Sequence, residues 1–140
     1  MSQTTLDIKE PGLNVLPPGV ERHVVNAGGL TGLQIFPDDE IEIINDEGNQ
    51  ICEIICFDKD GKSEIGILSL KENNKKSFIK EILNRKDENS LTTNLQLKKR
   101  NLSINKSKSS FLFDNNTPSG EKIKIKSKDK CYVIFSAPQD

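Results

Sequence analysis

The chain has 140 residues and a net charge of −1, with 34% hydrophobic and 29% charged residues. This length is enough for one domain with a hydrophobic core and too short for two domains of typical size, each with its own core. The N-terminus lacks the basic and apolar regions of a secretory signal, and the apolar runs are too short for a transmembrane helix. An odd number of cysteines, Cys52, Cys56 and Cys131, is typical of a reducing compartment, so we expect a cytoplasmic protein without a membrane partner.

The charge is distributed unevenly between the two halves of the chain. Residues 1–70 contain 13 acidic and 4 basic residues, a net charge of −9, whereas residues 71–140 contain 8 acidic and 16 basic residues, a net charge of +8. Such asymmetry is compatible with a basic binding face, with two halves that attract each other, or with a dipole that favours docking against a partner.

The first half of the chain predicts an extended lead-in followed by short strands. Proline and glycine turn signals recur through residues 1–20, so we expect the single β-rich domain to span residues 21–140. Strands are predicted at 21–26 and 33–36. The densest apolar stretch then predicts a β-hairpin, with strands at 40–44 and 50–57 joined by the turn Asn45-Asp-Glu-Gly-Asn. Because the second strand is apolar on both faces, we expect it to be central and covered on both sides.

The second half adds one helix and further strands. A strand is predicted at 65–70, and apolar residues at helical spacing predict a helix over about 75–86. Residues 87–101 fit a helix or a strand equally well. Strands are predicted at 102–104 and 111–113, and the turn Asn115–Gly120 leads into an alternating lysine strand and a last strand at 131–135. About eight short strands with one helix indicate a mainly β fold, an antiparallel β-barrel or sandwich.

Few residues suggest a catalytic, metal-binding or ligand-binding role. The chain has no phosphate-binding loop, nucleophile elbow or EF-hand motif, so we expect no catalytic residue, no metal site and no cofactor in it. Cys52 and Cys56 would lie roughly 13 Å apart on one strand face, which favours buried packing over a disulfide or metal site. Glu53 is a carboxylate among isoleucines and requires a partner. With Gln50, it is our candidate for a ligand-binding pocket.

The alternating lysines at 122–130 could contact phosphates. Aromatic residues do not alternate with them, and arginine is nearly absent from the chain. Lysines on an exposed strand face that discourage edge pairing are the simpler interpretation, so a nucleic-acid partner is not expected.

Two segments resemble known families. The first runs from Val25-Asn-Ala-Gly-Gly through Phe36-Pro-Asp-Asp-Glu-Ile-Glu-Ile and Asp46-Glu-Gly-Asn-Gln to Phe57-Asp-Lys-Asp-Gly-Lys, and it resembles the opening of the urea-carboxylase-associated family. The second joins Leu112-Phe-Asp-Asn-Asn-Thr-Pro-Ser-Gly-Glu to Cys131-Tyr-Val-Ile-Phe-Ser-Ala-Pro. It is similar to the close of the N-terminal extension found on some glycine cleavage T-protein (aminomethyltransferase) family members. Residues 71–110 carry no such resemblance.

This resemblance implies a non-catalytic accessory β-domain of a tetrahydrofolate-dependent aminomethyltransferase-like protein, contributing to substrate access or domain docking. The chain would then be a fragment of a longer protein, its partner a covalently linked or docked aminomethyltransferase domain, and tetrahydrofolate would be bound by the parent protein. No folate-contacting residue is transferable to these positions. The alternatives are a stand-alone β-barrel that binds a small-molecule ligand and, less favoured, a nucleic-acid-binding β-barrel.

Overall fold

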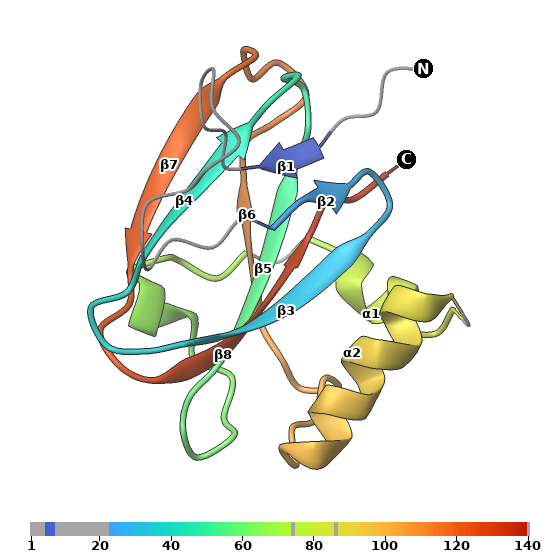
Figure 1. Ribbon diagram of the computed structural model, residues 1–140, viewed down its shortest axis with the longest axis vertical. Helices are drawn as coiled ribbons and strands as arrows, with labels where there is room; N and C mark the ends of the chain where they lie inside the picture. The colour runs from blue at the N-terminus through green and yellow to red at the C-terminus, as the bar shows by residue number, and fades with distance from the viewer. Residues whose placement is uncertain (1–4, 8–22, 74, 86, 140) are drawn as a thin grey trace.

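The fold is a β-sandwich with a helical layer on one side (Figure 1). A computed structural model of the protein describes residues 5–7, 23–73, 75–85 and 87–139. Within them, eight strands form two antiparallel sheets, with strand orders β2-β1-β4-β7 and β3-β8-β5-β6. The strands are β1 (Thr5–Asp7), β2 (Val25–Asn26), β3 (Leu30–Ile35), β4 (Glu40–Asn45), β5 (Cys52–Phe57), β6 (Ser109–Leu112), β7 (Glu121–Lys126) and β8 (Cys131–Ser136). The predicted mainly β architecture is therefore confirmed as a sandwich.

Two hydrophobic clusters lie on opposite faces of the sheet β3-β8-β5-β6. All six residues of β5 are buried, and they alternate between the clusters. Cys52, Ile54 and Cys56 pack between the two sheets, whereas Ile55 and Phe57 pack under the helices. The strand lies between β8 and β6, so the prediction of a central strand covered on both faces is confirmed.

The predicted hairpin of 40–44 with 50–57 is wrong. Strand β4 pairs with β1 and β7, and β5 pairs with β6 and β8, so the two segments belong to different sheets. Their alternation gives the correct inward faces, because Ile43 and Ile54 belong to the same core between the sheets. Period two specifies which face is buried but not which strand lies alongside. The turn after Asn45 therefore carries the chain across the sandwich.

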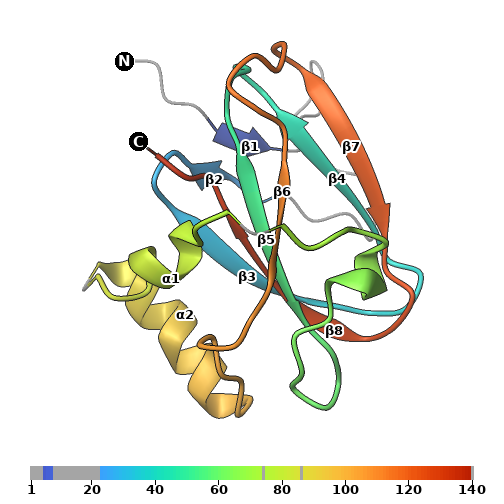
Figure 2. The ribbon, with the colours of Figure 1, turned by 180° about the vertical axis from the view of Figure 1, so that it is seen from behind.

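The helical layer differs from the expectation of a single helix. The helix predicted at 75–86 is shorter, α1 (Phe78–Ile82), and residue 86 lies outside the described residues. The ambiguous stretch 87–101 forms a longer helix, α2 (Glu88–Lys99). Both helices cover the same face of the sheet β3-β8-β5-β6 (Figure 2), where Ile79, Ile82 and Leu97 are buried.

Two predicted strands are absent from the described structure. Residues Ile65–Leu68 form a 3₁₀ helix, η1, that buries Ile65 and Leu68 against the core between the sheets. Their spacing of three suits a 3₁₀ turn, in which residues i and i+3 share a side. Residues 102–104 follow α2 as a loop whose Leu102 and Ile104 pack against the helical cluster.

The lead-in mostly lies outside the described residues. Its part that is described, Thr5–Asp7, is a strand placed between β2 and β4. The predicted strand at 21–26 is present only as Val25–Asn26, and residues 21 and 22 are not described. The domain boundary at residue 20 stays a prediction.

Gly32 provides a test of the packing between β3 and β8. A Cβ atom at this position would overlap the Tyr132 hydroxyl and lie 2.7 Å from its Cζ atom. We expect Gly32→Ala to lower the free energy of unfolding by about 1–3 kcal/mol, because the tyrosine ring must move within a packed cluster. Urea unfolding followed by circular dichroism measures the change.

Gly66→Ala is the matched control. Its Cβ atom would approach only the end of the Glu64 side chain, 2.9 Å away, which can move. We expect a change within about 0.5 kcal/mol. Equal losses for the two variants would contradict the packing of Tyr132 against Gly32.

Candidate functional site

The candidate site centres on Glu53, a fully buried carboxylate in the middle of a sheet. Glu53 pairs with Phe111 of β6 on one side and with Ser136 of β8 on the other. Its neighbours at alternate positions, Ile55 and Phe57, face the helical layer. Burying a charge in apolar surroundings is costly unless hydrogen bonds replace its water. The sequence therefore correctly identifies Glu53 as a residue that needs partners.

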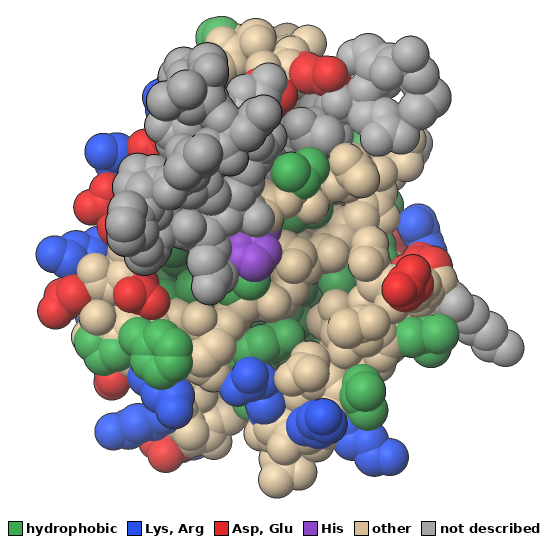
Figure 3. All heavy atoms as spheres, in the orientation of Figure 1, with side chains coloured by type: hydrophobic (Ala, Val, Ile, Leu, Met, Phe, Trp, Pro, Cys, Tyr) green, Lys and Arg blue, Asp and Glu red, His purple; other side chains and the backbone are tan. Residues whose placement is uncertain are grey.

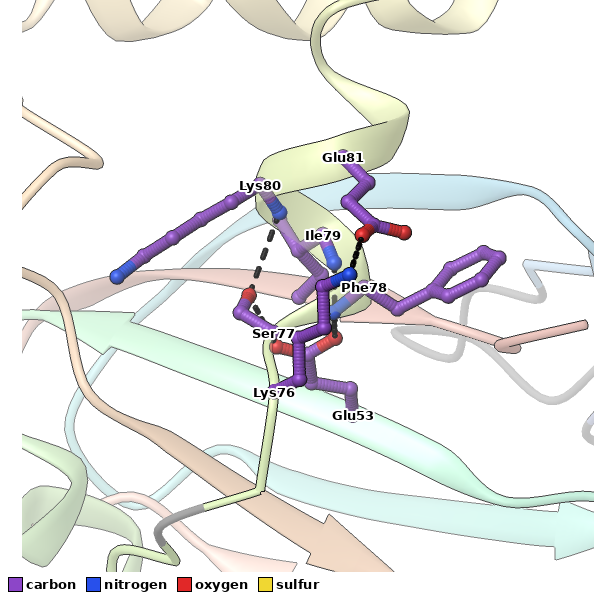
Figure 4. Close-up of polar contacts among 7 residues, drawn as sticks. All are labelled: Glu53, Lys76, Ser77, Phe78, Ile79, Lys80 and Glu81. Atoms are coloured by element: carbon purple, nitrogen blue, oxygen red, sulfur yellow. Dashed lines mark hydrogen bonds and ion pairs between the residues drawn. The ribbon is translucent and has the colours of Figure 1, made fainter.

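Four hydrogen bonds supply those partners, and Figure 4 shows the ones from Ser77, Phe78 and Ile79. Oε1 accepts from the backbone N–H groups of Phe78 and Ile79, both at 2.8 Å. Oε2 accepts from the hydroxyls of Ser77 and Ser109, both at 2.6 Å. The first N–H groups of a helix have no partner within the helix. Glu53 thus accepts the hydrogen bonds of the first backbone N–H groups of α1. Together with the two serine bonds, these contacts connect both α1 and β6 to the central strand.

Ser77 links the carboxylate to the helix. It is the N-cap of α1, and its Oγ accepts from the backbone N–H of Lys80 at 3.3 Å while it donates to Glu53. Serine is a favoured N-cap because its hydroxyl accepts such a bond. The helix therefore begins at residue 78 because two side chains, one local and one from β5, satisfy its first donors.

Gln50 belongs to a different network. Its side chain is 5% exposed, and Nε2 donates to the carbonyls of Ile51 at 2.7 Å and Pro138 at 2.8 Å. The hydrogen bonds of Glu53 reach α1 and β6 instead. The structure places both candidates in the interior without joining their hydrogen bonds, and a ligand-binding role for either residue stays a prediction.

The two turns that carry the family resemblance pack against each other. Asn49 N donates to Thr117 O at 2.8 Å, Gly120 N donates to Asn45 O at 2.7 Å, and Ser119 Oγ donates to Asp46 O at 2.6 Å. A Cβ atom on Gly48, whose φ is +81°, would lie 2.8 Å from Thr117 O. Glycine is therefore required both by its conformation and by this close approach. The resemblance thus marks one continuous structural unit at the end of the sandwich.

A cavity of about 410 Å³ opens beside Glu53. Ser77 and Ser109, the two serines that donate to the carboxylate, are in its wall. The described residues that line it are all polar or charged: Asn73, Lys75, Lys76, Ser77, Lys80, Glu81, Asn84, Ser107, Lys108 and Ser109. This lysine cavity joins residues before, within and after α1 with residues before and within β6.

Sequence reasoning missed the lysine cavity. From the sequence, no role is assigned to its four lysines, whose two segments lie about 30 positions apart. A signal was present in the clustering of Lys75 with Lys76 and of Lys106 with Lys108. Only the topology brings the two segments together, because β6 pairs with β5 beside α1.

The lysine strand presents a mixed surface. Lys124 Nζ lies 3.6 Å from Glu40 and 3.9 Å from Glu42, and Lys126 Nζ lies 4.0 Å from Asp38. Figure 3 shows acidic and basic side chains interspersed along the edge where Figure 1 places β4 and β7. These carboxylates reduce the positive potential that binding to phosphates requires.

The three cysteines are free and buried. Cys52 and Cys56 point into the core between the sheets, as their shared strand face predicts, and Cys131 joins the same cluster. Burial, with the neighbouring Glu53 carboxylate, raises the pKa of the Cys52 thiol. Packing is the role that this position supports.

Within residues 5–7, 23–73, 75–85 and 87–139, no three histidine, cysteine or acidic side chains gather closely enough to hold a metal ion. None of the helices in this part of the chain has the length and apolar character needed to span a bilayer.

Substitution of Glu53 tests its structural role. In Glu53→Gln, Oε1 can keep the two backbone donors and the new amide can donate to the serine oxygens, so we expect a loss of about 1–2 kcal/mol in the free energy of unfolding. Glu53→Leu leaves the N–H groups of Phe78 and Ile79 without a partner, and we expect a loss of about 3 kcal/mol or more. Urea unfolding compares both variants with the unsubstituted protein.

Glu81→Gln is the control for removing a carboxylate from the same region. Glu81 forms an ion pair with Lys76 at 2.6 Å and raises the pKa of that lysine, but both side chains are exposed. We expect a change below about 0.5 kcal/mol. The account of Glu53 fails if Glu53→Leu is no more destabilising than this control.

Comparison with known proteins gives one informative match. The chain is 31% identical over 131 residues to the trimethylamine-oxide aldolase of Ruegeria pomeroyi. The match covers 94% of this chain and 17% of the aldolase, so the chain spans less than a fifth of that relative's length. No model of a known protein family matches the sequence, and no solved structure matches the chain significantly. The matched region includes residues on both sides of the lysine cavity, since all but a few residues of the chain are aligned.

Proposed function

We propose that this β-sandwich is a non-catalytic accessory domain that docks onto a larger enzyme. The observation that carries the proposal is the coverage of the match, 94% of this chain against 17% of the aldolase. A segment of this size that folds around its own core is typical of a domain within a multidomain protein. The sandwich has such a core on each face of its second sheet.

The enzyme class follows from two sources that agree in part. The sequence resemblance implies a tetrahydrofolate-dependent aminomethyltransferase-like parent, whereas the relative is named an aldolase acting on trimethylamine oxide. Both names refer to a one-carbon group attached to an amine nitrogen. We therefore propose a parent or partner enzyme that acts on such a group. A tetrahydrofolate-dependent aminomethyltransferase is the narrower form of this proposal.

The accessory role is supported by the packing of the turns that carry the family resemblance. The strongest family-like segments, around Asn45–Gln50 and Thr117–Gly120, form one packed unit held by backbone hydrogen bonds. Gln50 connects this unit to Pro138 after the last strand. These contacts support a role in holding a defined shape, as a docking domain requires.

A domain exchange in the Ruegeria aldolase tests the proposal. The matched segment is replaced by this chain in one variant and by a flexible glycine–serine linker of equal length in another. We expect the linker variant to lose at least about tenfold in kcat/KM, or to fail to assemble, because the docked domain is missing. The exchange variant should recover most of that loss. Cleavage of trimethylamine oxide by the purified enzymes provides the readout.

Two results would contradict the accessory role. A linker variant as active and as stable as the parent enzyme would mean that the segment contributes neither docking nor substrate access. An exchange variant no better than the linker would mean that this chain does not share the role of the matched segment.

A further inference from the structure

The lysine cavity carries an inference that goes beyond the accessory role. We propose that it is a binding site for a small, multiply charged oxyanion, a phosphate or a polycarboxylate. The cavity volume of about 410 Å³ lies within the range of small-molecule sites. The described residues of its wall include four lysines and one glutamate, Glu81, and no aliphatic or aromatic residue. The ammonium groups favour an anionic ligand, and the aliphatic parts of the lysine side chains supply the apolar part of the lining.

The lysines are only partly neutralised. Lys76 pairs with Glu81, and Lys80 Nζ donates to the backbone carbonyls of Asn105 at 3.3 Å and Ser107 at 3.2 Å. Among the described residues, Lys75, Lys80 and Lys108 form no ion pair with a carboxylate. By contrast, Lys124 and Lys126 of β7 lie near acidic residues. Three of the four cavity lysines therefore lack a carboxylate partner among the described residues, whereas Lys122, Lys124 and Lys126 of β7 each have one within 4.0 Å.

The walls of the cavity are held in place before any ligand binds. Asn73 N donates to Ser109 O at 2.8 Å, which fixes the segment before α1 against β6. The Lys80 ammonium fixes the segment before β6, and the Lys75 ammonium lies 5.6 Å from the centre of the Phe111 ring. Prior ordering of this kind reduces the entropy lost on binding.

Glu53 determines how the two serines of the cavity wall can contact a ligand. Ser77 and Ser109 direct their hydroxyl hydrogens to Glu53, so these two residues offer lone pairs to the cavity and do not themselves bind an anion. The donors for an oxyanion are the lysine ammonium groups and the side-chain amides of Asn73 and Asn84. Glu53 is thus a positioning residue, which holds the two walls at a fixed separation through these serines.

Isothermal titration calorimetry at constant ionic strength tests the site. The probes are pyrophosphate and tricarballylate, which separate the phosphate from the carboxylate source, with acetate as a singly charged reference. We expect saturable binding of one equivalent of at least one of the two multiply charged probes, and none of acetate. The test variant is Lys75→Gln with Lys108→Gln, which keeps the hydrogen bonds from the Lys80 ammonium to the backbone carbonyls of the wall. We expect its affinity to fall at least about tenfold.

The control variant is Lys122→Gln with Lys124→Gln, which removes the same charge from β7. We expect it to bind the probe like the unsubstituted protein, and circular dichroism confirms that both variants are folded. The proposal is overturned if neither probe binds at concentrations up to about 10 mM, because a dissociation constant above that value would be too weak for a specific, preformed site. It is also overturned if the two variants lose affinity equally, which would indicate general attraction by surface charge. Neither outcome depends on the domain exchange.

Discussion

The buried carboxylate of Glu53 is the interaction on which the arrangement of the helical layer depends. It lies on the central strand β5 and accepts four hydrogen bonds from two other elements, α1 and β6. A buried charge without those bonds would be strongly destabilising, so the carboxylate and its donors require one another. Because its donors come from positions 24, 25, 26 and 56 residues along the chain, a single side chain fixes contacts that are distant in sequence.

This constraint has consequences for function because the segments it joins form the lysine cavity. Residues 71–110 carry no family resemblance of their own, yet they supply α1, α2 and all the described residues of the cavity wall. The segments that do carry the resemblance form packed turns around Asn45–Gln50 and Thr117–Gly120, and none of these turn residues lines the cavity. The domain therefore separates a region of structural turns from a polar cavity. We propose docking and oxyanion binding as the respective uses of such a domain.

The sequence predicts which face of each strand is buried better than it predicts which strands pair with each other. Alternation correctly assigns the inward side of β4, β5 and β7, since Ile43, Ile54 and Ile125 meet in one core. It could not choose between a hairpin and a crossing of the sandwich, because both keep the same faces buried. Helix α2 was ambiguous for a related reason. It buries Leu97 but exposes Leu91 and Leu95, so its apolar pattern is weak.

The same limit applies to the site. Burial of a carboxylate among isoleucines identified Glu53, but its donors are backbone and serine groups that no local pattern distinguishes. The lysine cavity depends on the pairing of β6 beside α1, which is a consequence of topology. Nothing in the sequence indicated that the Gln50 amide is bonded to the carbonyls of Ile51 and Pro138, and a ligand-binding role for Gln50 stays a prediction.

Hydrogen exchange of the Phe78 and Ile79 amides tests the central claim, that Glu53 fixes α1 to the sheet, most directly. Both N–H groups lie in the first turn of α1 and have no hydrogen-bond acceptor within the helix, so their protection must come from Glu53. We predict that they exchange only through global unfolding, with the same free energy of opening as the amides of β5. Exchange at the rate of an unprotected helix terminus, while β5 remains protected, would contradict the account.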